Sequence, residues 1–523
     1  MRAIAIILLL VTSATADDAI NPKQPKKKPR RPTVQITISK ETTRITKPLR
    51  ADGYVDYIAA LDQHASKGVT PKNNAAVLFF RAMGPTDKYM SKDVRTTYYK
   101  LLAIKPLAAE GDYFIDIEDY LETQKPAITE KEEEKFWDEF FRAAKHPWTK
   151  MDYPLLAGWL AANEKPLRLV VEGTRRPHCY WPLVGNKEDG ELLAVLKPGI
   201  QVGRRFTKAL CVRAMLHAGS GRIDAAWADL MASHRLARLT NGGPMLMDAI
   251  SGTVLENMTC QADVAMAHHV DLSAKRAKRF AAELVKLPLL DGLADKFDVA
   301  ERYMFLDSIR IMAQSLDEIS AKSAKSGAAL LRPRATNALV DWDHVSRKGN
   351  AWYDRIAAAA RQPVREDRNK AFRIISDELG KALEKTNDSK AVLKRMVLGE
   401  SPRKVVTETV GNRLAAFLPG RSMFDNYVDK AAARMEMTRL AFALAAYRAE
   451  NGSYPTRLAD LRPKFLAKVP TDIFSAADFH YRAGKGGYRL WSVGPNGRDD
   501  GGEGPHIEDY EGDGDDLLIA TGK

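Results

Sequence analysis

The sequence predicts a mainly α-helical protein in which an irregular helical repeat or bundle precedes a small α+β domain with a long helix and an antiparallel sheet. Three observations predict it. Apolar residues recur at three- and four-residue spacing through most of the chain, as on the buried face of a helix. A glycine-containing break at Gly219–Arg222 separates two such segments. Alternating segments typical of strands occur only near the C-terminus.

The first sixteen residues are typical of a secretory signal peptide. Arg2 precedes the apolar run "AIAIILLLV", which is too short to span a bilayer, and small residues follow at Ala14–Ala16. We therefore expect cleavage between Ala16 and Asp17 and export to the periplasm or the extracellular space. No later segment is apolar enough to predict a transmembrane helix.

Residues 17–48 lack periodicity, and we expect them to form a disordered basic tail. Part of the net charge of +13 lies in the tract Lys23–Pro32, and proline-rich basic runs rarely fold. The alternative is contact with nucleic acid or anionic lipid; we expect no nucleic-acid partner. The three cysteines leave one disulfide possible but exclude a disulfide framework, and they are interpreted as core residues.

Residues 49–420 are predicted to form the helical domain. Thr129, followed by carboxylates, is typical of a helix N-terminus. The two segments around Gly219–Arg222 predict a helical hairpin that resembles the tetratricopeptide type, but no regular repeat runs through the chain. Ser320–Ala338 is the expected internal loop. Pro419 and Gly420 mark the predicted boundary to the second domain.

Residues 421–523 are predicted to form the α+β domain. A long helix is expected over Tyr427–Glu450, and "NGSYP" ends it. The segments "DFHYRA" and "GYRLWSV", separated by "GKGG", predict a β-hairpin. The second strand should carry Tyr488, Leu490 and Ser492 on one face. One face should pack on the long helix through residues such as Leu440 and Leu444.

This C-terminal part, over about residues 427–519, resembles the globular domain of type II secretion major pseudopilins. The motifs are the "Y…NG.YP" helix exit, the hairpin, "SVGPNGRDDGGEG" and the later "DDLLI". The resemblance implies a long helix packed on a small sheet and a calcium-binding loop. The segment before this part does not resemble the family's processed leader and apolar N-terminal helix, so we expect no polymerisation through such a helix. The family's loop aspartate falls on Asn496.

The acidic loop is a candidate metal site on its own chemistry. Nine carboxylates and five glycines occur between Asp499 and Asp516, and Ca²⁺ prefers six to eight oxygen ligands in a flexible arrangement. The spacing is not that of an EF-hand, because the twelfth position from Asp509 is Ala520. The alternative is a solvated, partly disordered tail. The predicted calcium ligands are Asn496, Asp499, Asp500, Asp515 and Asp516.

The sequence contains no recognisable catalytic motif, and no catalytic residue is assigned. His217 and His234 lie on opposite arms of the helical hairpin and could meet, whereas the adjacent His268 and His269 should point about 100° apart on a helix. The first hypothesis is therefore a non-enzymatic, exported cell-envelope protein whose helical domain binds a protein partner. The alternative is a secreted hydrolase or other enzyme with a site in the helical domain, which a pocket containing histidines or carboxylates would favour.

Overall fold

The protein is mainly helical, with a small three-stranded antiparallel sheet near the C-terminus. The computed structural model describes residues 35–85, 90–126, 128–185, 191–195, 197–290, 292–323, 339–387, 389–415, 418, 421–484, 486–503 and 515–521. The predicted signal peptide, the tract Lys23–Pro32, most of the loop Ser320–Ala338, the boundary residues Pro419 and Gly420, and loop residues 504–514 lie outside the described residues.

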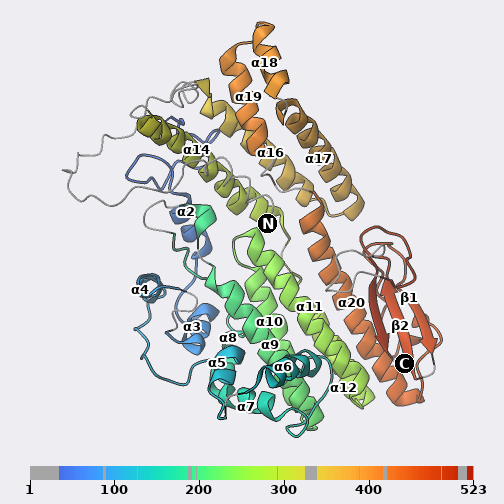
Figure 1. The fold of residues 1–523 in the computed structure, drawn as a ribbon. Helices are drawn as coiled ribbons and strands as arrows, with labels where there is room; N and C mark the ends of the chain where they lie inside the picture. Colours follow the sequence, from blue (N-terminus) through green and yellow to red (C-terminus); the bar gives the residue numbers. More distant parts are fainter. Residues whose placement is uncertain are drawn as a thin grey trace.

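The N-terminal helices lie along one side and at one end of a longer bundle (Figure 1). They are α2 (Tyr57–Ala65), α3 (Ala75–Met83), α4 (Lys92–Leu101), α5 (Ile117–Glu122), α6 (Glu130–Ala143), α7 (Pro154–Ala162), α8 (Glu164–Gly173) and the short 3-10 helix η1 (Leu192–Ala194). The predicted cap of α6 is confirmed: the Thr129 hydroxyl accepts the backbone N–H of Glu132, and the Glu132 carboxylate accepts that of Thr129.

The bundle consists of α9 (Pro198–Gly219), α10 (Ile223–Asn241), α11 (Leu246–His269) and α12 (Ala274–Val285). The predicted helical hairpin is confirmed, because α9 and α10 pack together around the break at Gly219–Arg222. A Cβ atom on Gly219 would lie 2.1 Å from the carbonyl oxygen of Trp148, so the segment before α7 reaches the bundle only because this residue is glycine.

A second core forms around the π-helical turn η2 (Phe297–Glu301), α14 (Arg302–Ser323), α16 (Trp342–Ala360), α17 (Arg365–Asn387) and α19 (Pro402–Ala415). Helix α13 (Ala294–Lys296) precedes η2, and α18 (Ser389–Val397) packs on α17 and α19. The segments from α13 to α14 follow one another without a break, so they form one long helix with a π turn inside it.

Residues 35–48 correct the prediction of a disordered tail that extends to residue 48. Ile36 is 3% exposed and belongs to the second core. Asn350 of α16 donates from Nδ2 to the carbonyl oxygens of Glu41 (2.8 Å) and Thr42 (3.1 Å). The Tyr57 hydroxyl donates to the Thr43 carbonyl oxygen. The segment is ordered because distant side chains satisfy its backbone polar groups, which its own sequence does not reveal.

The C-terminal part contains α20 (Arg421–Asn451), the 3-10 helix η3 (Leu458–Leu461), β1 (His480–Gly484), β2 (Gly487–Ser492) and β3 (Leu517–Thr521). The predicted hairpin is confirmed: β1 and β2 are antiparallel, with Gly484 opposite Gly487. Strand β3, which the pattern alone did not predict, pairs with the other edge of β2. Tyr488 and Leu490 are buried, as expected, in a core with Leu440 and Leu444 of α20.

Helix α20 is longer than predicted and is buried from two sides. Figure 1 shows it between the bundle helices α11 and α12 and the sheet. Phe442 and Ala446 belong to the bundle core, whereas Leu440 and Leu444 belong to the core beneath the sheet. The two predicted domains therefore share this helix. Among the described residues, no helix has the length and apolarity needed to cross a bilayer.

Candidate functional sites

The acidic loop starts from a fixed point at the end of β2. Asp472 is fully buried and accepts hydrogen bonds from the Ser492 hydroxyl (2.9 Å) and the Val493 backbone N–H (3.1 Å). Buried carboxylates are stable only when their oxygens are paired in this way. These bonds hold Ser492, the last residue of β2, in place, and so they fix the direction in which the acidic loop leaves the strand.

Glycines then turn the chain back toward β3. Gly494 and Gly497 have φ angles of +63° and +73°, in the left-handed region that glycine adopts at least cost. A Cβ atom on Gly494 would lie 2.2 Å from the carbonyl oxygen of Asp515 and 2.7 Å from its Oδ1 atom. Only glycine allows the loop to approach the start of β3 so closely.

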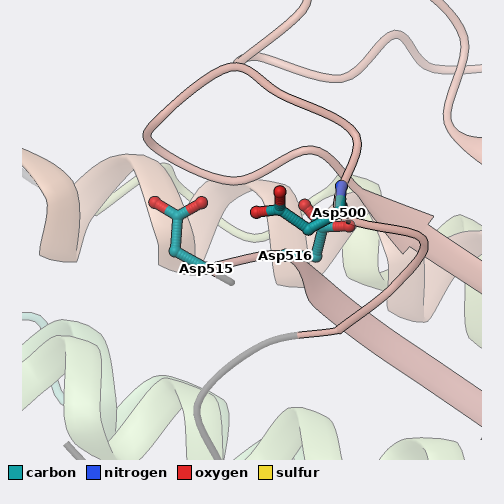
Figure 2. Close-up of side chains that lie close together, drawn as sticks. All are labelled: Asp500, Asp515 and Asp516. Carbon is teal, nitrogen blue, oxygen red and sulfur yellow. Dashed lines mark hydrogen bonds between the residues drawn. The ribbon is translucent and has the colours of Figure 1, made fainter. Parts of the chain in front are cut away.

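Three carboxylates meet at this approach. The side chains of Asp500, Asp515 and Asp516 offer oxygen atoms that all lie within 4.8 Å of one another (Figure 2). Asp516 is 5% exposed, and its Oδ2 atom accepts the backbone N–H groups of Asp500 (3.0 Å) and Gly502 (2.8 Å). The backbone N–H of Asn496 donates to Oδ2 of Asp515 (2.9 Å).

Two of the other carboxylate oxygens lack partners among the described residues. The Oδ1 atoms of Asp515 and Asp516 are both buried, and neither has a hydrogen-bond partner in the described part of the chain. Burial and the nearby charge of Asp500 raise the pKa of both carboxyls above the usual value, although backbone N–H groups oppose the shift. The arrangement therefore favours a cation or a proton at these oxygens. Hard oxygen donors of this kind fit Ca²⁺.

The five predicted ligands do not all face this point. Asn496 lies beside it, since its Nδ2 atom donates to Oδ2 of Asp500 (2.9 Å). Asp499 faces elsewhere: its carboxylate accepts the indole N–H of Trp491 (2.9 Å) and lies 3.4 Å from Nδ1 of His480. The structure thus gathers Asp500, Asp515 and Asp516 and directs Asp499 toward the outer face of the hairpin.

Helix α17 holds the same loop from the helical domain, a contact that the sequence did not predict. Arg365 donates from Nη2 to the Pro495 carbonyl oxygen (3.2 Å) and from Nε to the buried Asp429 of α20 (3.1 Å). Its guanidinium also lies over the Phe474 ring at 4.6 Å. The loop geometry therefore depends on both parts of the chain.

A cavity of about 550 Å³ opens in the helical domain, a size usual for small-molecule sites. Its lining includes His64, Cys179, Trp181 and Lys296. Burial raises the pKa of the Cys179 thiol to about 12, so this sulfur is protonated at neutral pH and is a poor nucleophile. Lys296 donates from Nζ to the carbonyl oxygens of Asn241 (2.8 Å) and Gly243 (2.7 Å), which fixes the turn between α10 and α11.

The two histidines of the helical hairpin have different carboxylate partners. His234 is fully buried and contacts Glu256 (3.0 Å) and Asp263 (2.7 Å) of α11. His217 lies 3.6 Å from Asp229, which also binds the buried Arg213 at 2.7 Å. Burial alone would lower the pKa of His234, but the charges of Glu256 and Asp263 raise it to about 9. This network neutralises charges inside the bundle.

Comparisons with family models, with curated proteins and with solved structures give no match to this chain.

Proposed function

We propose that the protein is an exported cell-envelope protein that binds a protein partner through its helical domain and carries a calcium-stabilised, pseudopilin-like C-terminal module. The observation that supports the calcium site most directly is the pair of buried, unpartnered Oδ1 atoms of Asp515 and Asp516, close to the carboxylate of Asp500. The signal-peptide pattern of residues 1–16 supports export.

The proposed role of the ion is structural. Asp500 belongs to the loop after β2, whereas Asp515 and Asp516 immediately precede β3. Ca²⁺ would neutralise three carboxylates that otherwise repel one another, and it would hold the loop against the third strand. The order of long helix, β-hairpin and acidic glycine-rich loop supports the pseudopilin-like assignment, and so does the packing of β2 on α20.

A scaffold role for the helical domain is supported by its buried ionisable groups, because they pair with one another between helices. Arg213 pairs with Asp229, and His234 pairs with Glu256 and Asp263, each pair between neighbouring bundle helices. These contacts stabilise helix packing. Helices α11, α12 and α20 lie side by side, so a partner bound to the helical domain would meet a surface that is continuous with the C-terminal module (Figure 1).

The test is a thermal melt of the full chain in calcium and in a chelator. We expect calcium in hundredfold excess over its dissociation constant to stabilise the fold by about 2.7 kcal/mol, because it binds the folded state only. Asp516→Asn should remove this effect, while Asp138→Asn on the exposed face of α6 should keep it. Equal melting temperatures in calcium and chelator, with no binding heat by calorimetry, would contradict the calcium site.

The proposed protein partner is tested separately. The full chain, immobilised and incubated with cell-envelope extract, should retain a partner that an equal amount of heat-unfolded chain does not retain. Because the helical domain carries the proposed partner surface, capture should survive Asp516→Asn. Capture that is equal for folded and unfolded chains would contradict the scaffold function and leave the calcium site unaffected.

A second candidate function, a secreted hydrolase or other enzyme, is favoured by the cavity that His64, Cys179 and Lys296 line. Chromogenic ester, peptide and phosphate substrates test it directly. Turnover that His64→Ala abolishes, and that the distant His344→Ala leaves intact, would support an enzyme. Turnover that both variants retain would place any activity outside this cavity.

A further inference from the structure

Three histidine rings meet where the segment after α6 reaches the C-terminal end of α11. His146 follows α6, and His268 and His269 are the last two residues of α11. The ring centres of His146 and His269 are 4.4 Å apart, and those of His268 and His269 are 4.5 Å apart. From helix geometry we expected the side chains of His268 and His269 to point apart. Nothing in the sequence predicted that His146 would lie beside them.

We propose that His146, His268 and His269 form a binding site for one divalent transition-metal ion of the Zn²⁺ type. Neutral imidazole nitrogen is a ligand that suits Zn²⁺, Cu²⁺ and Ni²⁺. With Zn–N distances of about 2.0–2.1 Å, the ring centres of two tetrahedral histidine ligands lie about 5 Å apart. Both measured separations are within an ångström of that value.

The surrounding structure holds the two segments together. Trp148, two residues after His146, is 3% exposed and donates from its backbone N–H to Met215 and from its indole N–H to Val212, both carbonyl oxygens of α9. On the other side, α11 is packed along its length against α10 and α20. The backbone two residues after His146 is therefore anchored to α9, which limits the entropy lost when an ion binds.

The environments of the three histidine side chains are also consistent with metal binding. His146 and His269 are exposed, so an ion can reach them from solvent. The Nδ1 atom of His268 is buried without a hydrogen-bond partner among the described residues, and such an atom is costly unless something binds it. The ligand atoms of the three residues do not yet lie within 4.8 Å of one another, as those of the aspartates do. Binding of an ion would therefore require the exposed His146 and His269 rings to rotate toward a common point.

One neighbouring charge opposes the site. The guanidinium of Arg448 on α20 acts electrostatically on His268, and it also lies over the Tyr454 ring at 5.5 Å. A cation at this position repels a divalent ion and weakens binding. Arg448→Gln is therefore expected to tighten metal binding, an effect that histidines with a packing role alone would not produce.

The experiment uses the full chain without an affinity tag, with Zn²⁺ in calorimetry and Co²⁺ as a spectroscopic probe. We expect one Zn²⁺ per chain at this site and visible Co²⁺ absorption bands characteristic of low-coordinate nitrogen ligation. His146→Ala and His269→Ala should each weaken binding at least tenfold. His344→Ala, which removes an exposed histidine of α16, should leave it unchanged.

Two further measurements test whether the variants remain folded and whether Zn²⁺ binds at the acidic loop instead. Circular dichroism of the metal-free variants checks that the substitutions leave the fold intact, which their exposed positions favour. Asp516→Asn distinguishes this site from the acidic loop. Zn²⁺ binding that disappears in Asp516→Asn but persists in His146→Ala and His269→Ala would overturn the proposal, and so would the absence of any Zn²⁺ binding.

Discussion

His234 donates from Nε2 to the carboxylate of Asp263 across 2.7 Å in the middle of the helical bundle, and neither side chain is exposed to solvent. Nδ1 of the same ring lies 3.0 Å from the Glu256 carboxylate, which also accepts from Arg238. One histidine of α10 thus holds two acidic residues of α11. Its charge is required because an unpaired buried carboxylate is strongly unfavourable.

The first prediction follows from this pairing. His234→Phe removes the positive charge but keeps a ring of similar size, so Glu256 and Asp263 lose their shared partner. We expect the free energy of unfolding to fall by about 3–5 kcal/mol, measured by urea denaturation at pH 7. His344→Phe on the exposed side of α16 serves as the control and should change stability little.

The same pair predicts a pH dependence. The pKa of His234 is raised to about 9 in the folded protein from an ordinary value of 6.5. Its contribution is therefore complete below about pH 6.5 and is lost as the pH rises through about 9. The stability difference between the native chain and His234→Phe should shrink between pH 7 and pH 10 in urea titrations. A difference that stays constant over this range would show that the ring is neutral in the fold.

Two glycines of the acidic loop offer a matched comparison. Gly494 and Gly497 both have positive φ angles, so alanine at either position costs roughly 1–2 kcal/mol in backbone strain. At Gly497 nothing lies within 4 Å of the new Cβ atom, whereas at Gly494 it would overlap the backbone of Asp515. We expect Gly494→Ala to destabilise the chain by about 1–3 kcal/mol more than Gly497→Ala in urea titrations. Equal losses would mean that the loop does not approach Asp515 as described.

The ordered segment at residues 35–48 predicts different effects for two truncations. A chain that begins at residue 49 loses the buried Ile36 and leaves Asn350 and Tyr57 without their backbone acceptors. We expect it to be about 2–4 kcal/mol less stable than a chain that begins at residue 35. The measurement is chemical denaturation of both chains side by side. Identical midpoints would support a disordered tail up to residue 48 after all.

The shared helix α20 predicts that the two parts of the chain unfold together. Phe442 is fully buried, and its ring packs edge-on against Trp227 at 5.5 Å and Phe280 at 5.7 Å. Phe442→Ala should cost about 3–5 kcal/mol, and the exposed Phe141→Ala much less. Fluorescence and far-ultraviolet circular dichroism should follow a single transition in the native chain. Two separate transitions would indicate that the C-terminal module folds without the bundle.

Features that depend on neighbouring residues were predictable. The Thr129 cap, the break at Gly219–Arg222 and the hairpin around Gly484–Gly487 each arise from side chains and backbone preferences within a few positions. Alternation also placed Tyr488 and Leu490 on one face of β2, because alternate residues of a strand point to opposite sides. It did not show that Trp491 on the other face is buried as well. The acidic loop was recognised as a candidate metal site from its composition.

Which residues take part in each site could not be predicted in the same way. Asp499 and Asp500 are adjacent and chemically identical, yet Trp491 binds the first and the second faces Asp515 and Asp516. Which one turns inward depends on the register of β2 with β3 and on the loop path through Gly494. These are contacts between segments that sequence spacing does not fix.

The sequence by itself determined where most helices and the β1–β2 hairpin form and where the carboxylates concentrate, since these properties follow from local backbone preference, hydrophobic spacing and composition. The tertiary structure alone decided that α16 holds residues 35–48, although Asn350 and Glu41 are 309 positions apart. It also decided that α20 serves two cores and that His146 meets His269. The physical reason is that burial and pairing depend on which distant surfaces meet, whereas propensity depends on the nearest neighbours along the chain.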